Sequence, residues 1–201
     1  AYTTEPGHIE RLTEQLCRDV QAVTARFGPE QVIVENIYSG GGRYLQPAFL
    51  PEVVSAVVRE TGCGFLFDLS HARLAAHQLG WNVYEYINTL PIEYTCEIHL
   101  TGIQRIDEHW LARVRQDGVA LKFLEEFAGQ LMDHLPLTDE DWGFMSWLIA
   151  QLQTGVIKQP WMIALEYGGV GPLWETLTEV EVLLEQVPRL HRLIQSLQPN
   201  P

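Results

Sequence analysis

The chain has 201 residues, of which 46% are hydrophobic, and this is enough for one sizeable core. It carries 13 basic and 26 acidic residues, and the formal charge of −13 at pH 7 disfavours partners such as nucleic acid or an anionic membrane surface. No stretch approaches the ~18 apolar residues of a membrane span, and the three cysteines are odd in number and far apart. We therefore expect one domain over residues 1–201, reduced cysteines and a cytoplasmic location.

Helical patterns and short apolar runs alternate along the chain, which indicates an α/β fold of parallel strands. Apolar spacings of three and four predict helices over 5–27, 47–60, most of 72–90, 119–131, 142–152 and 172–197, the last kinked at Pro188. Runs rich in β-branched or aromatic residues predict strands at 32–34, 64–68, 94–100 and 162–167, and 131–137 is a weaker strand candidate. Thr138 is a predicted N-cap, with Asp141 completing a capping box.

Each of the four predicted strands carries a side chain that can bind a metal at or near its carboxyl end: Glu35, Asp68, His99 and Glu166. Ligands bind at the carboxyl ends of strands in open α/β sheets and (β/α) barrels, so we expect these four to share a site. Carboxylates and imidazole, without a thiolate, favour iron, manganese or zinc over copper(I). The alternative for any one of the acids is a helix cap at a strand-to-helix junction.

Further polar residues lie close to these strand ends. Glu97 is two residues before His99, so both side chains point to the same face of the strand. His71 follows Asp68 on a predicted loop, and the stretch 39–43 (SGGGR) is predicted to be a flexible loop over the site. Asp133 and His134 interrupt the end of an apolar helix, and from a loop both could reach a metal.

Five segments together resemble a known family: VIVENI, GFLFDLSHARLAAHQLGW, INTLPIEYTCEIHLTG, MDHLPLTDEDW and MIALEYGG. In this order they are similar to the multinuclear non-haem iron-dependent oxidases, formerly a domain of unknown function, in the xylose-isomerase-like TIM-barrel superfamily. The resemblance covers about residues 5–184. It implies a TIM-barrel-like (β/α) fold with two or three iron ions, and oxidation by dioxygen of a cysteine or its neighbour in a ribosomal peptide. A partner protein that presents the peptide is also implied.

Carried over position by position, the resemblance implies that the metal ligands are Glu35, Asp68, His99, Asp133, His134 and Glu166. It gives His71 and Glu97 a role in supporting these ligands or contacting the substrate.

Three features depart from the family pattern. Asp133 and His134 are adjacent, whereas the family has one residue between them, and Gly168 stands where the family has an aspartate. The family's first strands are absent from this sequence, so we expect an incomplete barrel whose open edges could pair with another chain or a second copy.

Two other functions are compatible with the same residues. One is a divalent-metal sugar-isomerase-like enzyme or hydrolase of the same superfamily. The other is a degenerate barrel that binds a peptide or partner protein without catalysis.

Overall fold

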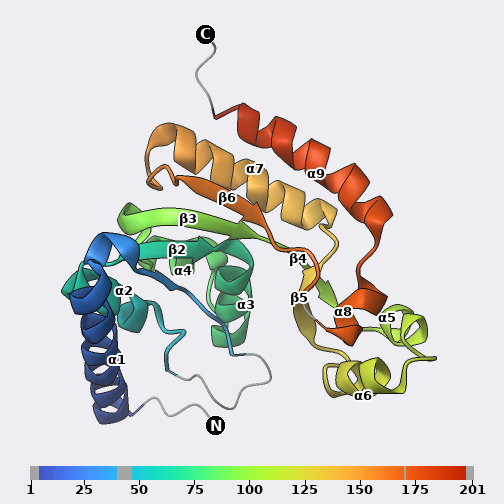
Figure 1. Ribbon diagram of the computed structural model, residues 1–201, viewed down its shortest axis with the longest axis horizontal. Coiled ribbons are helices and arrows are strands. Elements are labelled where there is room, and N and C mark those ends of the chain that lie inside the picture. Colours follow the sequence, from blue (N-terminus) through green and yellow to red (C-terminus); the bar gives the residue numbers. More distant parts are fainter. Residues whose placement is uncertain (1–4, 40–46, 170, 198–201) are drawn as a thin grey trace. The chain divides into compact units, whose positions relative to one another are not determined.

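The computed structural model describes residues 5–39, 47–169 and 171–197 (Figure 1). Most of the predicted loop 39–43 lies outside these ranges. The chain divides into two compact units, which are described separately: unit 1 comprises residues 1–99 and 155–163, and unit 2 comprises 100–154 and 164–201. A single domain over the whole chain stays a prediction. No helix in the described ranges is long and apolar enough to cross a bilayer.

Four strands form a parallel sheet in the order β1-β2-β3-β6 (Figure 1). They are β1 (Ile33–Glu35), β2 (Gly64–Asp68), β3 (Thr95–Leu100) and β6 (Met162–Leu165). All four were predicted from the sequence, and their alternation with helices confirms the α/β class. Among the described residues this sheet is open and does not close into a barrel, which agrees with the expected incomplete TIM-barrel-like fold.

The described residues of unit 1 form four α-helices: α1 (Pro6–Phe27), α2 (Pro51–Thr61), α3 (Leu69–Leu79) and α4 (Val83–Thr89). Short 3-10 turns at Pro29–Gln31 and Ile92–Tyr94 precede β1 and β3. Both α1 and α2 begin with a proline. Proline suits the first turn, because the backbone N–H groups there have no partner within the helix and the N–H that proline lacks is not needed. α2 ends at Gly62, whose left-handed conformation suits glycine. The core of this unit contains the buried valines of α2 and the phenylalanines of β2: Val53, Val54, Val57, Val58, Phe65 and Phe67.

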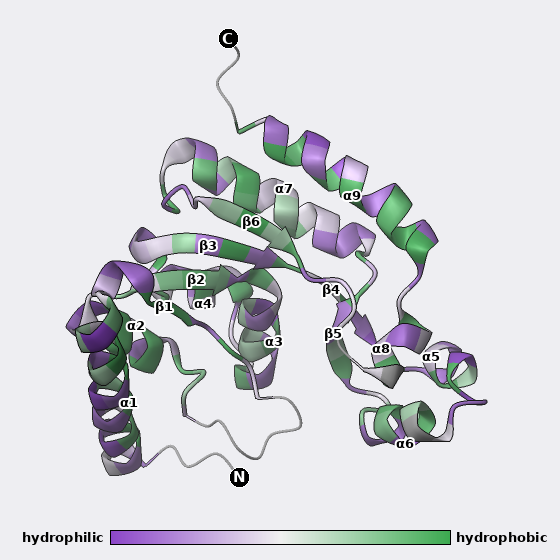
Figure 2. Cartoon of the chain, viewed as in Figure 1, coloured by the Kyte–Doolittle hydropathy of each residue, from purple (hydrophilic) through white to green (hydrophobic). Residues whose placement is uncertain are grey.

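Unit 2 is built around an antiparallel pair, β4 (Gly102–Arg105) with β5 (Leu131–Leu135). Its helices are α5 (Glu108–Arg113), α6 (Gly118–Glu126), α7 (Asp139–Thr154), α8 (Pro172–Leu177) and α9 (Val180–Gln195). One apolar cluster joins the strands to α5, α6 and α8: Ile106, Trp110, Val114, Ala120, Leu124, Met132, Leu135 and Leu177. Figure 2 shows hydrophobic and hydrophilic residues alternating along α9, as expected of an amphipathic helix.

The sequence predictions for unit 2 need three corrections. The helix predicted over 119–131 ends at Glu126, because Leu131 pairs with Arg105 in the β-ladder. Asp133 and His134 therefore lie on a strand and not in a loop or at a helix end. The helix predicted over 172–197 is two helices separated by Thr178 and Glu179, and Pro188 lies inside the second.

The predicted capping box at the start of α7 is confirmed. The Thr138 hydroxyl accepts from the Asp141 N–H at 3.3 Å, and the Asp141 carboxylate accepts from the Thr138 N–H at 2.7 Å. Each side chain satisfies a backbone donor that the helix leaves unpaired. This box marks the beginning of the helix that follows β5.

Candidate metal centre

Three of the predicted ligands converge in unit 1. Glu35 and Asp68 are the last residues of β1 and β2, and His99 is the next-to-last residue of β3, directly opposite Asp68 in the register. One ligand atom from each side chain lies within 4.8 Å of those of the other two. Metal bonds of about 2.0–2.2 Å join donor atoms up to about 4.4 Å apart, so small side-chain rotations would bring all three onto one ion. The donor set of two carboxylates and an imidazole fits iron, manganese or zinc.

The electrostatics of this cluster also favour a cation. The Asp68 side chain is fully buried, and those of Glu97 and His99 are only 8% and 13% exposed. Carboxylates that are close together and poorly solvated repel one another, and their desolvation is costly unless positive charge compensates them. A divalent ion held by Glu35, Asp68 and His99 would supply that charge.

Asp68 is both a helix cap and a candidate ligand. Its Oδ1 accepts from the backbone N–H of His71 at 2.7 Å and so caps α3. Its Oδ2 lies 3.7 Å from the His71 Nδ1 atom. The capping alternative considered for the strand-end acids thus holds for Asp68, and it fixes the carboxylate in one orientation at the end of β2.

Asn36 is a structural residue of this site that sequence reasoning did not single out. It is completely buried, its Nδ2 donates to the Asp68 carbonyl, and its Oδ1 accepts from the Asp68 N–H, both at 2.9 Å. This two-point contact ties the residue after Glu35 to the end of β2. The signal in the sequence is weak: Asn36 directly follows the strand-end Glu35. A polar side chain that is buried at such a place must find a hydrogen-bond partner.

His71 lies in the first turn of α3 and not on a loop, because the cap formed by Asp68 starts that helix at Leu69. Its Nδ1 is 2.9 Å from the Asn36 carbonyl, so this nitrogen carries the hydrogen, and it is also 3.1 Å from Glu35 Oε1. The ring therefore lies beside the Glu35 carboxylate. This geometry is typical of residues that orient a metal ligand.

Glu97 and His99 lie on the same face of β3, as the period of two predicts. The His99 Nε2 atom is 2.9 Å from Glu97 Oε1. A carboxylate on one ring nitrogen sets the tautomer and the orientation of an imidazole, and makes its other nitrogen a better donor to a metal.

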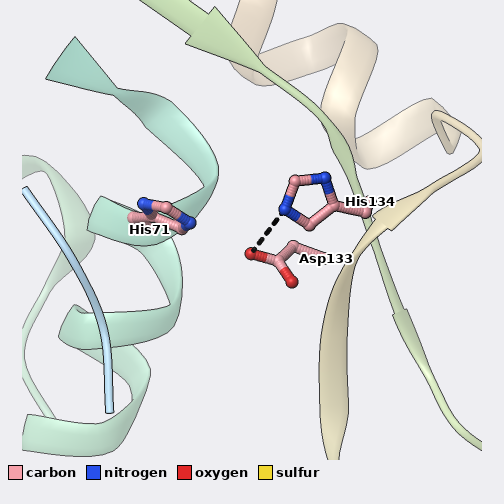
Figure 3. Close-up of side chains that lie close together, drawn as sticks. All are labelled: His71, Asp133 and His134. Carbon is pink, nitrogen blue, oxygen red and sulfur yellow. Dashed lines mark ion pairs between the residues drawn. The ribbon is translucent and has the colours of Figure 1, made fainter. Parts of the chain in front are cut away.

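The other predicted ligands belong to unit 2. Asp133 and His134 are neighbours on β5, and His134 Nε2 lies 4.0 Å from Asp133 Oδ2, the pair joined by the dashed line in Figure 3. The figure also labels His71, which belongs to unit 1. Glu166 directly follows β6, and its N–H donates to the Leu100 carbonyl at 2.9 Å.

The backbone of His134 explains how two adjacent residues bring their side chains together. Successive side chains of a regular strand point to opposite faces. The φ angle of His134 is 60°, the only positive value among the described non-glycine residues, and this left-handed conformation breaks the alternation. It costs about 1–2 kcal/mol for an L-residue. In the described part of the chain, the buried Nδ1 of His134 has no hydrogen-bond partner, as suits a ring nitrogen that binds a metal.

The structure also explains why glycine stands at position 168. Gly168 has φ 83°, and a Cβ there would lie 2.4 Å from the Thr178 hydroxyl oxygen. Its N–H donates to the His134 carbonyl at 3.0 Å. A side chain at this position would be strained by the backbone conformation and would crowd the Thr178 hydroxyl.

The cysteines lie outside this ligand set, and all three are free thiols. Burial and a hydrogen bond with Glu60 raise the pKa of Cys17 to about 11, and burial raises the pKa of Cys63. Since the thiolate is the reactive form, neither thiol is activated as a nucleophile.

One family model and two known proteins are similar to parts of this chain. A family model described as RiPP precursor modification enzyme MbnB/TglH/ChrH matches residues 8–137, which include Glu35, Asp68, His99, Asp133 and His134. A UPF0276 protein of Paraburkholderia phytofirmans is 39% identical over 72 residues, which are 35% of this chain and 24% of that protein. A UPF0276 protein of a Caulobacter species is 41% identical over 46 residues, or 23% of this chain and 17% of that protein.

The relatives thus match over less than a quarter of their own length, whereas the family model matches well over half of this chain. The matched range contains β1, β2 and β3 with the three predicted ligands that converge in unit 1. The chain therefore belongs to the RiPP precursor modification enzyme MbnB/TglH/ChrH family.

Proposed function

We propose that the protein is a metal-dependent enzyme that uses dioxygen to modify a cysteine, or a residue next to it, in a ribosomally made peptide. The observation that carries this proposal is the convergence of Glu35, Asp68 and His99 at neighbouring strand ends. The family membership supports a peptide as the substrate. Iron is the proposed metal, in two or three ions as in the resembling oxidases, and bound ferrous iron would supply the activation of dioxygen. Manganese and zinc fit the same donors.

The chain's own residues have separate parts in this proposal. Glu35, Asp68 and His99 hold a metal, Glu97 orients the His99 imidazole, and His71 holds the Glu35 carboxylate. Asp133, His134 and Glu166 are proposed as further ligands carried by unit 2.

The expected location, partners and assembly of the protein also remain proposals. They are a cytoplasmic location, a partner protein that presents the peptide, the absence of nucleic-acid and membrane partners, and assembly of copies through the sheet edges β1 and β6. A divalent-metal isomerase or hydrolase remains an alternative enzyme.

A degenerate barrel that only binds a peptide or partner is favoured by one observation. Gly168 lacks the acidic side chain that the resembling oxidases have there, and its φ angle and the nearby Thr178 hydroxyl would strain a replacement. A binder of this kind would need no metal.

Metal analysis of protein purified without oxygen tests these alternatives. We expect two or three iron ions per chain, measured by inductively coupled plasma mass spectrometry after purification from iron-supplemented cells. One zinc or manganese ion would support the isomerase or hydrolase. A metal-free protein that still binds peptide would contradict the proposed enzyme and support the binder.

Neutralising single carboxylates should separate metal binding from folding. We expect Glu35→Gln and Glu166→Gln to lower the metal content while the melting temperature of the metal-free protein changes by only about 2 °C. For Glu35 the reason is that removing its negative charge relieves repulsion with the nearby Asp68 carboxylate. The matched control is Glu30→Gln, an exposed acid just before β1, which should keep the full metal content. Unfolding of metal-free Glu35→Gln would show instead that this glutamate is a structural ion-pair partner.

A further inference from the structure

Two groups that follow β6 in unit 2 contact His134, whose backbone is strained. The first is the Gly168 N–H, which donates to the His134 carbonyl at 3.0 Å. The second is the indole of Trp174 on α8, whose ring centroid lies 5.6 Å from that of the imidazole, with the planes at 62°. This edge-on arrangement is a favourable geometry for two aromatic rings. The backbone of His134 is thus in contact with Gly168, and its ring with Trp174.

Trp174 can occupy this position only because residue 169 is glycine. A Cβ on Gly169 would lie 2.5 Å from both Cδ1 and Nε1 of the indole. Real Cβ atoms do not approach other atoms so closely, so any side chain at position 169 would push the indole away from its place. Gly169 and Trp174 therefore form a matched pair, in which the missing side chain makes room for the ring.

Trp174 also packs against the apolar cluster of unit 2, together with its neighbour Leu173. A ring that served the core alone would need neither the contact with the imidazole nor the close approach to Gly169. In the described part of the chain, the buried Nδ1 of His134 has no hydrogen-bond partner. The direction in which this nitrogen points depends on how the ring is oriented, and the contact with Trp174 restricts that orientation.

We propose that Trp174, seated on Gly169, is a positioning residue that fixes the imidazole of His134 in the orientation in which it binds the metal. This inference rests on the proposed function, since it takes His134 as a ligand. Trp174 itself touches neither metal nor substrate in this role. It acts by restricting rotation of the His134 ring, while Gly168 restrains the backbone on which the ring is carried.

The test compares substitutions that move the indole with one that only weakens the core. Gly169→Ala displaces the ring without removing apolar volume, Trp174→Leu removes the ring, and Trp174→Phe keeps an aromatic group. Leu173→Ala is the matched control, because Leu173 belongs to the same helix and packs on the same cluster. The Fe²⁺ affinity of the anaerobic metal-free chain is measured by titration calorimetry, and its melting temperature by circular dichroism.

We expect Gly169→Ala and Trp174→Leu to lower the Fe²⁺ affinity by about 10-fold or more, as is usual when a group that orients a ligand is lost. Trp174→Phe should stay within about 3-fold of the wild type, and Leu173→Ala should lower the melting temperature without a comparable loss of affinity. The His134 imidazole signals in the NMR spectrum of the metal-free protein should shift in Gly169→Ala, which reports a moved ring independently of any metal.

Two results would overturn the inference while leaving the proposed function standing. One is wild-type affinity in Trp174→Leu. The other is an equal loss of affinity in Leu173→Ala, which would mean that metal binding merely follows stability. A wild-type chain that binds no Fe²⁺ would overturn the proposed function, and the positioning role with it.

Discussion

Replacing His99 with alanine is expected to lower the affinity for Fe²⁺ by about 100-fold or more, whereas His71→Ala should lower it by only about 10-fold. His99 is one of the three side chains whose ligand atoms lie within 4.8 Å of one another in unit 1. His71 instead donates through Nδ1 to the Asn36 carbonyl and approaches Glu35, so its loss loosens a ligand without removing one. The difference thus separates a residue that binds the metal from one that supports a ligand.

The measurement is titration of the metal-free, oxygen-free protein with Fe²⁺, at a temperature where circular dichroism shows each variant to be folded. His77→Ala is the control, because His77 is an exposed residue in the last turn of α3 and its loss should leave the affinity unchanged. Equal losses in His99→Ala and His71→Ala would contradict the distinction between ligand and supporting residue.

The largest effect on stability is expected for Asn36→Ala, which should lower the free energy of unfolding by about 2–4 kcal/mol. The substitution removes two hydrogen bonds of 2.9 Å, one to the N–H and one to the carbonyl of the fully buried Asp68. Such groups cannot turn to water, so their desolvation adds to the loss of the bonds themselves.

Urea unfolding of the metal-free protein measures this effect. Asn82→Ala is a suitable control, because the Asn82 side chain also accepts from two backbone N–H groups, those of Tyr84 and Glu85, but at the exposed start of α4. Loss of that cap should cost about 1 kcal/mol. An Asn36→Ala variant no less stable than Asn82→Ala would show that the contact between the ends of β1 and β2 contributes little.

Much of unit 1 could be predicted from sequence because its signals are local. Each strand is a short apolar run bounded by turn residues, and Asp68 ends one run abruptly before a helix. A parallel sheet aligns the carboxyl ends of its strands, so the expectation that Glu35, Asp68 and His99 meet needed only the strand assignments. The position of His71 was missed, since the cap that starts α3 at Leu69 depends on which way the Asp68 carboxylate turns.

Unit 2 was harder to predict because its elements depend on contacts between distant residues. The segment around Met132 is apolar enough for a helix end or for a strand, and pairing with β4 decides in favour of the strand. The short helix α5 starts at an Asp107 cap that lies within a charged stretch and carries little apolar periodicity.

By itself, the sequence determined the α/β class, the four parallel strands and the acids and histidines at their ends, because period, turn residues and residue type are properties of short segments. Only the tertiary structure decided the rest. It showed that buried Asn36 joins β1 to β2, that a left-handed His134 brings its ring toward Asp133, and that a side chain at Gly168 would crowd Thr178. Each of these depends on atoms that come from distant parts of the chain or on a single backbone angle, and neither is encoded in a local pattern of residue types.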